Sequence, residues 1–128
     1  MISTERVLFS LQMSEESLQE VHLLLRDHKT RSLLNSLYNV FYYGMEAILL
    51  NQDIHCRSHA ELKKVFFEKI IRSGLLPEHS SGWENKIETV FKVKEENEKG
   101  KIFTSEEIQR FIQSGEMFFN SVKKHLLV

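Results

Sequence analysis

One long apolar segment constrains this sequence more than any other feature. Between about Arg31 and Leu50, apolar residues recur at intervals of three and four, which is the spacing of one face of an α-helix. That face is wide, and its members are Leu34, Leu37, Tyr38, Phe41, Tyr42, Met45, Ile48 and Leu49. We therefore expect one buried helix around which the rest of the chain assembles, since only a central helix hides so much of its surface.

Four further segments repeat this spacing. Their ranges are Val7 to Leu25, Leu62 to Ile70, Ile87 to about Gly100, and Ile108 to Leu126. Gly74 and Pro77 predict where the third helix ends, because glycine favours the left-handed turn beyond a helix and proline cannot continue one. Alternating strand patterns are nearly absent. The sequence predicts an all-α fold, a five-helix up-and-down bundle.

Helix starts support this prediction independently. In a capping box, a hydroxyl accepts a hydrogen bond from a free backbone N–H, and a carboxylate three residues later reaches back to another. Three pairs have this form and each precedes a periodic segment: Ser58 with Glu61, Ser81 with Glu84, and Thr104 with Glu107.

Length and composition bound the class of protein. The chain has 128 residues, of which 41% are hydrophobic and 27% charged, as expected for a single globular domain over residues 1–128. A formal charge of -1 gives no sign of an extended basic surface for duplex nucleic acid, although a local patch is compatible with it. The sequence shows no apolar run of membrane-spanning length and no leader-like start. We expect a cytoplasmic protein that does not contact a membrane.

His55, Cys56 and His59 form the densest group of metal-ligating side chains. A structural zinc site needs four ligands, and Arg57 inside the group would repel a cation. A helix start can activate a thiol, but no base is held beside Cys56 in the sequence pattern. We expect a solvated loop, an inert cysteine that forms no internal disulfide, and no metal or cofactor.

Two features of the helical segments are open to two interpretations. Tyr38 and Tyr42 share a helix face, whereas Tyr43 points a quarter turn away. Phenol rings can stack on a base or donate to a phosphate, but packing is the favoured interpretation for at least two of the three. The charged run over residues 92–99 predicts a solvated helix end with pairs one turn apart: Lys92 with Glu96, Lys94 with Glu98, and Glu95 with Lys99.

Several short motifs together resemble those of HEPN domains, especially a small stand-alone group of uncharacterised proteins. The motifs are Asn35-Ser36-Leu37-Tyr38-Asn39-Val40-Phe41, the Ser58-His59 pair, Phe66, and Ser73-Gly74-Leu75-Leu76. The resemblance spans about residues 29–125. It departs from the family where Ser36 replaces an arginine and Asn39 a tyrosine of the central helix.

The family's fourth helix ends in a string like Arg-x-x-x-Asp-Tyr-Gly. Here that string falls on Lys94, Glu98, Lys99 and Gly100, which keeps two charges and the glycine. Lysine presents a point charge where arginine presents a fork, so bidentate contacts are lost.

HEPN proteins that cleave RNA carry an arginine and a histidine on one helix with four to six residues between them. Arg72 and His79 have that spacing, but Gly74 and Pro77 lie between them and predict a turn. The resemblance therefore implies a HEPN fold without catalytic residues. A metal-independent ribonuclease and a purely structural protein-interaction module remain as alternatives.

What the resemblance implies is a binding or partner module. Small HEPN proteins are commonly homodimers and are often paired with a minimal nucleotidyltransferase in toxin–antitoxin-like modules. A nucleotide or RNA would bind in a groove between the central helix and the charged end of the fourth, with Lys94 at a phosphate and a tyrosine stacking or donating. The candidate contacts are Asn35, Tyr38, Asn39, Tyr42, His59, Lys94 and Glu98.

Overall fold

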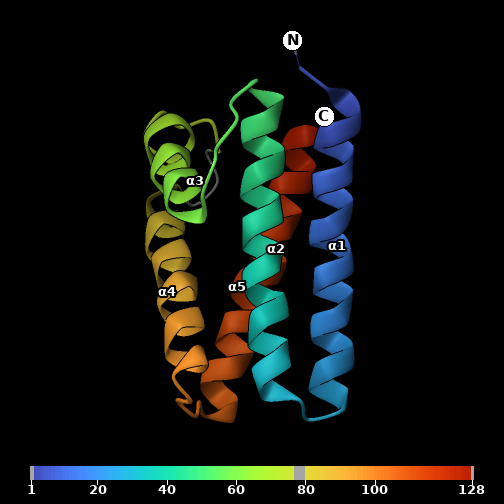
Figure 1. Ribbon diagram of the computed structural model, residues 1–128, viewed down its shortest axis with the longest axis vertical. Helices are drawn as coiled ribbons and strands as arrows, with labels where there is room; N and C mark the ends of the chain where they lie inside the picture. Colours follow the sequence, from blue (N-terminus) through green and yellow to red (C-terminus); the bar gives the residue numbers. More distant parts are fainter. Residues whose placement is uncertain (1, 77–79, 128) are drawn as a thin grey trace.

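The computed structural model describes residues 2–76 and 80–127. For Ser80 and Ser81 it describes the backbone but not the side chains. Five α-helices pack into a bundle in these residues, and no strand occurs among them (Figure 1). The helices are α1 (Thr4–Arg26), α2 (Thr30–Asn51), α3 (His59–Phe66), α4 (Ser80–Glu98) and α5 (Ser105–Leu126). The all-α bundle predicted from the sequence is confirmed.

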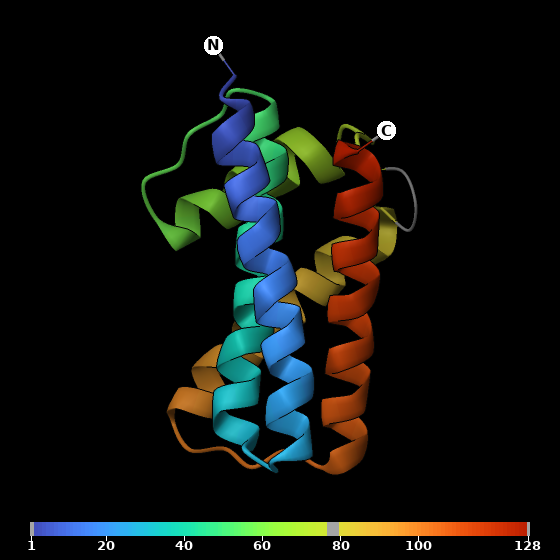
Figure 2. The same cartoon turned by 90° about the vertical axis from the view of Figure 1, so that its right-hand side faces the viewer.

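The four long helices alternate in direction, while α3 is short and lies across one end of the bundle (Figures 1 and 2). The chain descends α1, rises along α2, descends α4 and rises along α5. Among the described residues, none of the helices combines the length and apolarity that crossing a lipid bilayer requires.

Helix α2 occupies the centre, as its wide apolar face predicts. It is unbroken from Thr30 to Asn51, and α1, α4 and α5 all pack against it. Phe118 of α5 shows how the elements meet, since its ring stacks on Phe41 of α2 with centroids 4.7 Å apart. The same ring contacts Phe66 of α3 and Trp83 of α4 edge-on, at 6.1 and 5.4 Å. One buried aromatic side chain thus touches rings from three other helices.

Two of the predicted caps are present. The Thr104 hydroxyl accepts from the backbone N–H of Glu107 at 3.1 Å, and the Glu107 carboxylate accepts from the Thr104 N–H at 2.9 Å, which completes a capping box. Ser58 likewise accepts from the N–H of Glu61 at 3.1 Å. The Glu61 carboxylate, however, accepts from the N–H of Arg57 at 3.0 Å. In the predicted capping box it would accept from the N–H of Ser58, so this hydrogen bond is shifted by one residue.

The segment after α3 continues as one π-helical turn, Phe67–Ile71. The chain then leaves the helix at Gly74, whose φ of 79° is the left-handed conformation that the sequence predicts at this end. Pro77 and the side chain of Ser81 lie outside the described residues, so the third predicted cap is not described. Helix α4 itself begins at Ser80.

Candidate functional site

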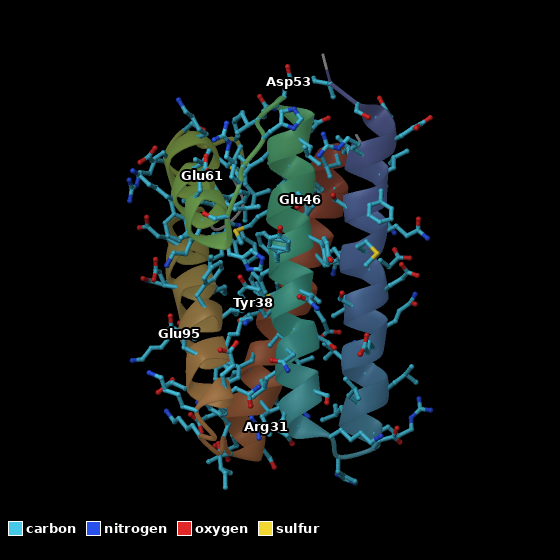
Figure 3. The ribbon with its side chains drawn as sticks, in the orientation of Figure 1. Arg31, Tyr38, Glu46, Asp53, Glu61 and Glu95 are labelled. Atoms are coloured by element: carbon cyan, nitrogen blue, oxygen red, sulfur yellow. The ribbon has the colours of Figure 1, made fainter. Side chains whose placement is uncertain are left out.

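One strip of α2 stays open to solvent between α1 and α4. Asn35, Asn39, Tyr42 and Glu46 follow one another at spacings of three and four, which places them on one helix face. Asn35 and Asn39 are exposed, and Tyr42 and Glu46 are half-buried. Glu46, at one end of this strip, is labelled on α2 in Figure 3, and the buried Tyr38 is labelled lower on the same helix. A ligand can reach the central helix along this strip.

An aromatic cluster lies where α3 begins beside this strip. The Tyr38 hydroxyl lies 2.7 Å from Nδ1 of His59. The His59 ring stacks on Tyr42 with centroids 4.3 Å apart and an interplanar angle of 28°. Tyr38 and Tyr42 are themselves nearly parallel, at 6.4 Å. Three rings from two helices therefore form one stack.

The loop from α2 to α3 positions His59. Ile54 and Cys56 in this loop pack against the hydrophobic core, and Leu62 on the next turn of α3 is buried in it. Ser58 caps α3, so His59 is the first residue of the helix. Because the chain is anchored in the core before and after His59, the imidazole is held against α2, although residue 59 is exposed to solvent.

The charged end of α4 meets the same cluster. The ammonium of Lys94 lies 4.9 Å from the centre of the Tyr38 ring, and it forms an ion pair with Glu98. Phe91, one turn earlier, meets Tyr38 edge-on at 5.1 Å. The sequence predicts a surface shared by the central helix and the end of the fourth, and the structure brings those residues together.

Asn97 is a residue of this region that the sequence analysis missed. Its side chain is only 2% exposed. Its amide nitrogen donates to the backbone carbonyl of Arg31 at 3.1 Å and to the side-chain oxygen of Asn35 at 3.5 Å. The signal was in the sequence, because Asn97 follows Val93 by four residues on the apolar face of α4, where a polar side chain needs a buried partner.

All seven predicted site residues thus lie on or beside the open strip of α2. Contacts link five of them: Tyr38, Tyr42, His59, Lys94 and Glu98. Asn35 contacts Asn97 of α4 and none of these five, and Asn39 takes part only by its position on the same face. Asn35, Asn39, His59 and Glu98 are exposed, so the site is an open surface and does not have the form of an enclosed groove. Its role in binding stays a prediction.

The two phenols of the cluster keep their protons at neutral pH. Burial raises the pKa of Tyr38 to about 12, helped by the neighbouring Tyr42 and by the carboxylate of Glu98. Burial also raises the pKa of Tyr42, with a further contribution from Glu46. The Tyr38 hydroxyl therefore stays protonated in its hydrogen bond with Nδ1 of His59, and Nε2 is the imidazole nitrogen that this contact leaves unused.

The group around Cys56 has the contacts of a structural loop. His55 lies 3.3 Å from the guanidinium of Arg6 and 3.2 Å from the carboxylate of Asp53. Burial, together with Glu61 and Glu46, raises the pKa of the Cys56 thiol, which favours the predicted inert cysteine over a reactive thiolate. Within residues 2–76 and 80–127, no three histidine, cysteine or acidic side chains gather as metal ligands would.

The charged run of α4 pairs partly as predicted. Lys94 and Glu98 form the expected pair one turn apart. Glu96 instead pairs with Lys101, beyond the end of the helix, at 3.1 Å, so its predicted pairing with Lys92 is wrong. Lys101 also lies over the ring of Phe103 at 5.1 Å, a local contact in the loop after α4, where helix spacing no longer applies.

Arg72, the arginine of the alternative nuclease pair, has a different partner. Its guanidinium forms an exposed ion pair with Glu84 of α4 at 3.0 Å. His79 lies outside the described residues. The arrangement of this pair is therefore not described.

Comparison with known proteins gives one distant relative. The chain matches no family model. It is 21% identical over 113 residues to a UPF0332 protein of Thermotoga maritima, an alignment that covers 87% of this chain and 83% of the relative. The chain is thus a distant homologue of that protein over most of its length. The relative's name states no activity, ligand or partner.

Proposed function

We propose that this chain is a HEPN-type binding module whose open α2 surface binds a nucleotide or the nucleotides of a single-stranded RNA. The observation that carries the proposal is the stack of Tyr38, Tyr42 and His59 with the ammonium of Lys94 beside it. A nucleotide needs both groups, since its base stacks on an aromatic ring and its phosphate seeks a cation.

The stack is suited to a base because part of it is accessible. Tyr42 is half-buried and His59 is exposed, so the stack is open to solvent on the His59 side. Stacking of a base on an aromatic side chain contributes about 1–3 kcal/mol and tolerates different bases. The Nε2 atom of His59 and the exposed amide of Asn35 add hydrogen-bonding groups that could select among them.

The Lys94–Glu98 pair does not prevent phosphate binding. The Glu98 side chain is 57% exposed, and exposed ion pairs contribute only about 0–1 kcal/mol. An incoming phosphate can therefore replace the Glu98 carboxylate as the partner of the Lys94 ammonium, and the carboxylate is then hydrated by solvent. This exchange makes Glu98 a residue that weakens anion binding.

Binding of adenosine monophosphate at low salt tests the proposal. Lys94→Met should weaken binding about tenfold or more, because it removes the phosphate partner, whereas Glu98→Gln should tighten it. Lys86→Met is the matched control, since Lys86 is a lysine of α4 that likewise lies over an aromatic ring, that of Trp83 at 5.5 Å, but it lines the depression between α4 and α5. Equal loss in the Lys94 and Lys86 variants would contradict the assignment.

The partners implied by the HEPN resemblance are part of the proposal. They are a second copy of this chain in a homodimer and a minimal nucleotidyltransferase. Support comes from the distant homology to a UPF0332 protein and from the motifs of α2, α3 and α4. Light scattering of the purified chain measures its mass in solution. Copurification from its own cells, followed by mass spectrometry, identifies a transferase or its absence.

A metal-independent ribonuclease is the second candidate, favoured by one observation. His59 and Lys94 both contact Tyr38, which brings an imidazole and a cation to one surface. An imidazole can transfer protons and a cation can stabilise charge on a phosphate. RNA cleavage in EDTA that is lost in His59→Ala would support this activity, and loss in His79→Ala would assign it to the Arg72–His79 pair. No cleavage by the natural sequence removes the candidate.

A further inference from the structure

We infer that Lys63 of α3 forms a second phosphate subsite, so that the surface takes a single-stranded polynucleotide in preference to a mononucleotide. The inference rests on the proposed function and extends it to the class of ligand. It starts from a line of contacts that crosses three helices.

Each of the two lysines lies over one ring of a contacting pair. The Lys63 ammonium lies 4.9 Å from the centre of the Phe91 ring. The Phe91 ring meets Tyr38 at 5.1 Å, and the Lys94 ammonium lies 4.9 Å from the centre of the Tyr38 ring. One cation comes from α3 and the other from α4.

The position of Lys63 on α3 joins it to the proposed site. Lys63 and His59 are four residues apart and therefore lie on the same face of the helix. His59 stacks on Tyr42. Both lysines therefore border the aromatic cluster, and their partners Glu88 and Glu98 lie ten residues apart on α4, which places the two ammonium groups at different levels along that helix. Figure 3 shows α3, where Glu61 is labelled, beside the upper part of α2, with Tyr38 labelled lower on α2.

A mononucleotide and a polynucleotide differ in how they can use two such cations. A nucleoside monophosphate carries phosphate on one side of its sugar and can reach one lysine while its base stacks. A polynucleotide carries a phosphate on both sides of every internal nucleotide, so one stacked base places charge toward both lysines. Two cations that border one aromatic cluster match the second pattern.

Both lysines also have the same electrostatic setting. The Lys63 side chain is 27% exposed and pairs with Glu88, whose side chain is 51% exposed, at 3.3 Å. Lys94 is 31% exposed and pairs with Glu98, which is 57% exposed. Each ammonium is therefore partly sheltered and held by one weakly bound carboxylate that a phosphate can replace.

The test compares two probes on three variants. The probes are adenosine monophosphate and an oligouridylate of about eight nucleotides, a length within the usual range for single-strand sites. Lys63→Met should weaken oligouridylate binding about three- to tenfold at low salt and reduce the slope of log K against log salt by about 0.7, the value for one lost phosphate contact. It should leave the affinity for the monophosphate unchanged. Lys94→Met should weaken both probes, and the control Lys86→Met neither.

A further variant at the same subsite shows whether weaker binding of Lys63→Met comes from misfolding. Glu88→Gln keeps the Lys63 side chain and frees its charge, so it should tighten oligouridylate binding without changing that of the monophosphate. An oligodeoxythymidylate of equal length separates the two sugars. If Lys63→Met weakens the binding of both oligonucleotides equally, the subsite accepts the phosphates of RNA and of DNA. If it weakens only the binding of oligouridylate, the subsite is specific for RNA.

The outcomes separate this inference from the proposed function. If Lys63→Met binds oligouridylate as tightly as the natural sequence, or loses both probes equally, the second subsite is wrong while nucleotide binding stands. If the natural sequence binds neither probe, the proposed function fails with it.

Discussion

Tyr38 and His59 are 21 residues apart in the sequence, yet the Tyr38 hydroxyl and Nδ1 of His59 lie 2.7 Å apart. This contact ties the middle of α2 to the first residue of α3. It also determines which imidazole nitrogen stays available to a ligand, because the phenol occupies Nδ1 and leaves Nε2 outside this contact. That choice is thus set by a buried residue of another helix.

The raised pKa of Tyr38 predicts how stability depends on alkaline pH. Tyrosine in the unfolded chain has a pKa near 10, whereas that of Tyr38 in the folded chain is about 12. The folded state holds this proton more tightly, so the associated stability is complete below about pH 10 and is lost as the pH rises through about 12. Urea denaturation should show the free energy of unfolding falling over this interval, and falling less in Tyr38→Phe. Identical pH profiles in the two proteins would contradict the assignment; Tyr43→Phe is the control.

Asn97→Ala should destabilise the protein by about 1–2 kcal/mol, because a buried amide loses its hydrogen bond to the Arg31 carbonyl. Asn120→Ala on the exposed face of α5 is the control, since it makes the same chemical change in a helix without a buried partner. Chemical denaturation measures both. Equal stability of the two variants would show that the α2–α4 contact does not depend on Asn97.

Gly44→Ala should destabilise the protein by about 1–3 kcal/mol through overpacking. A Cβ at Gly44 would lie 2.8 Å from Cε2 of Phe118, a fully buried ring that has no room to retreat. At Gly82 of α4 the nearest atom is the flexible end of Lys86, at 3.3 Å. Gly82→Ala should therefore be neutral or gain up to about 1 kcal/mol of helix propensity. Thermal melting that ranks the two variants in the opposite order would contradict the packing of α2 on α5.

Thr104→Ala should destabilise the protein by about 0.5–2 kcal/mol, as expected for a lost N-cap. The hydroxyl and the Glu107 carboxylate satisfy two backbone N–H groups at the start of α5. Ser105→Ala, one residue later and exposed, removes a hydroxyl that is not the cap and should change the free energy of unfolding by less than about 0.5 kcal/mol. Urea denaturation distinguishes the two.

The sequence predicts those parts of the structure that depend on local spacing. The central position of α2 follows from its wide apolar face, and the cap at Thr104 follows from a hydroxyl three residues before a carboxylate. The shared face of Tyr38 and Tyr42 follows from their separation of four. These features need only helical geometry.

Contacts between distant segments could not be predicted in the same way. The Tyr38–His59 hydrogen bond depends on the path of the loop over residues 52–58, and that path depends on where Ile54 and Cys56 find room in the core. Lys63 reaches Phe91 only because α3 crosses α4. Helix spacing carries no information about such crossings. Asn97 differs, since a polar residue on an apolar face was visible and could have been identified as a buried hydrogen-bonding group.

The most direct test of the central claim is a titration of the 15N-labelled chain with oligouridylate, followed by the backbone amide signals. The proposal predicts saturable shifts that cluster on the open strip of α2, the start of α3 and the end of α4. The residues expected to move are Asn35, Tyr38, Asn39, Tyr42, His59, Lys94 and Glu98. Unmoved signals for these seven amides at saturating oligouridylate, or shifts confined to another face of the bundle, would contradict it.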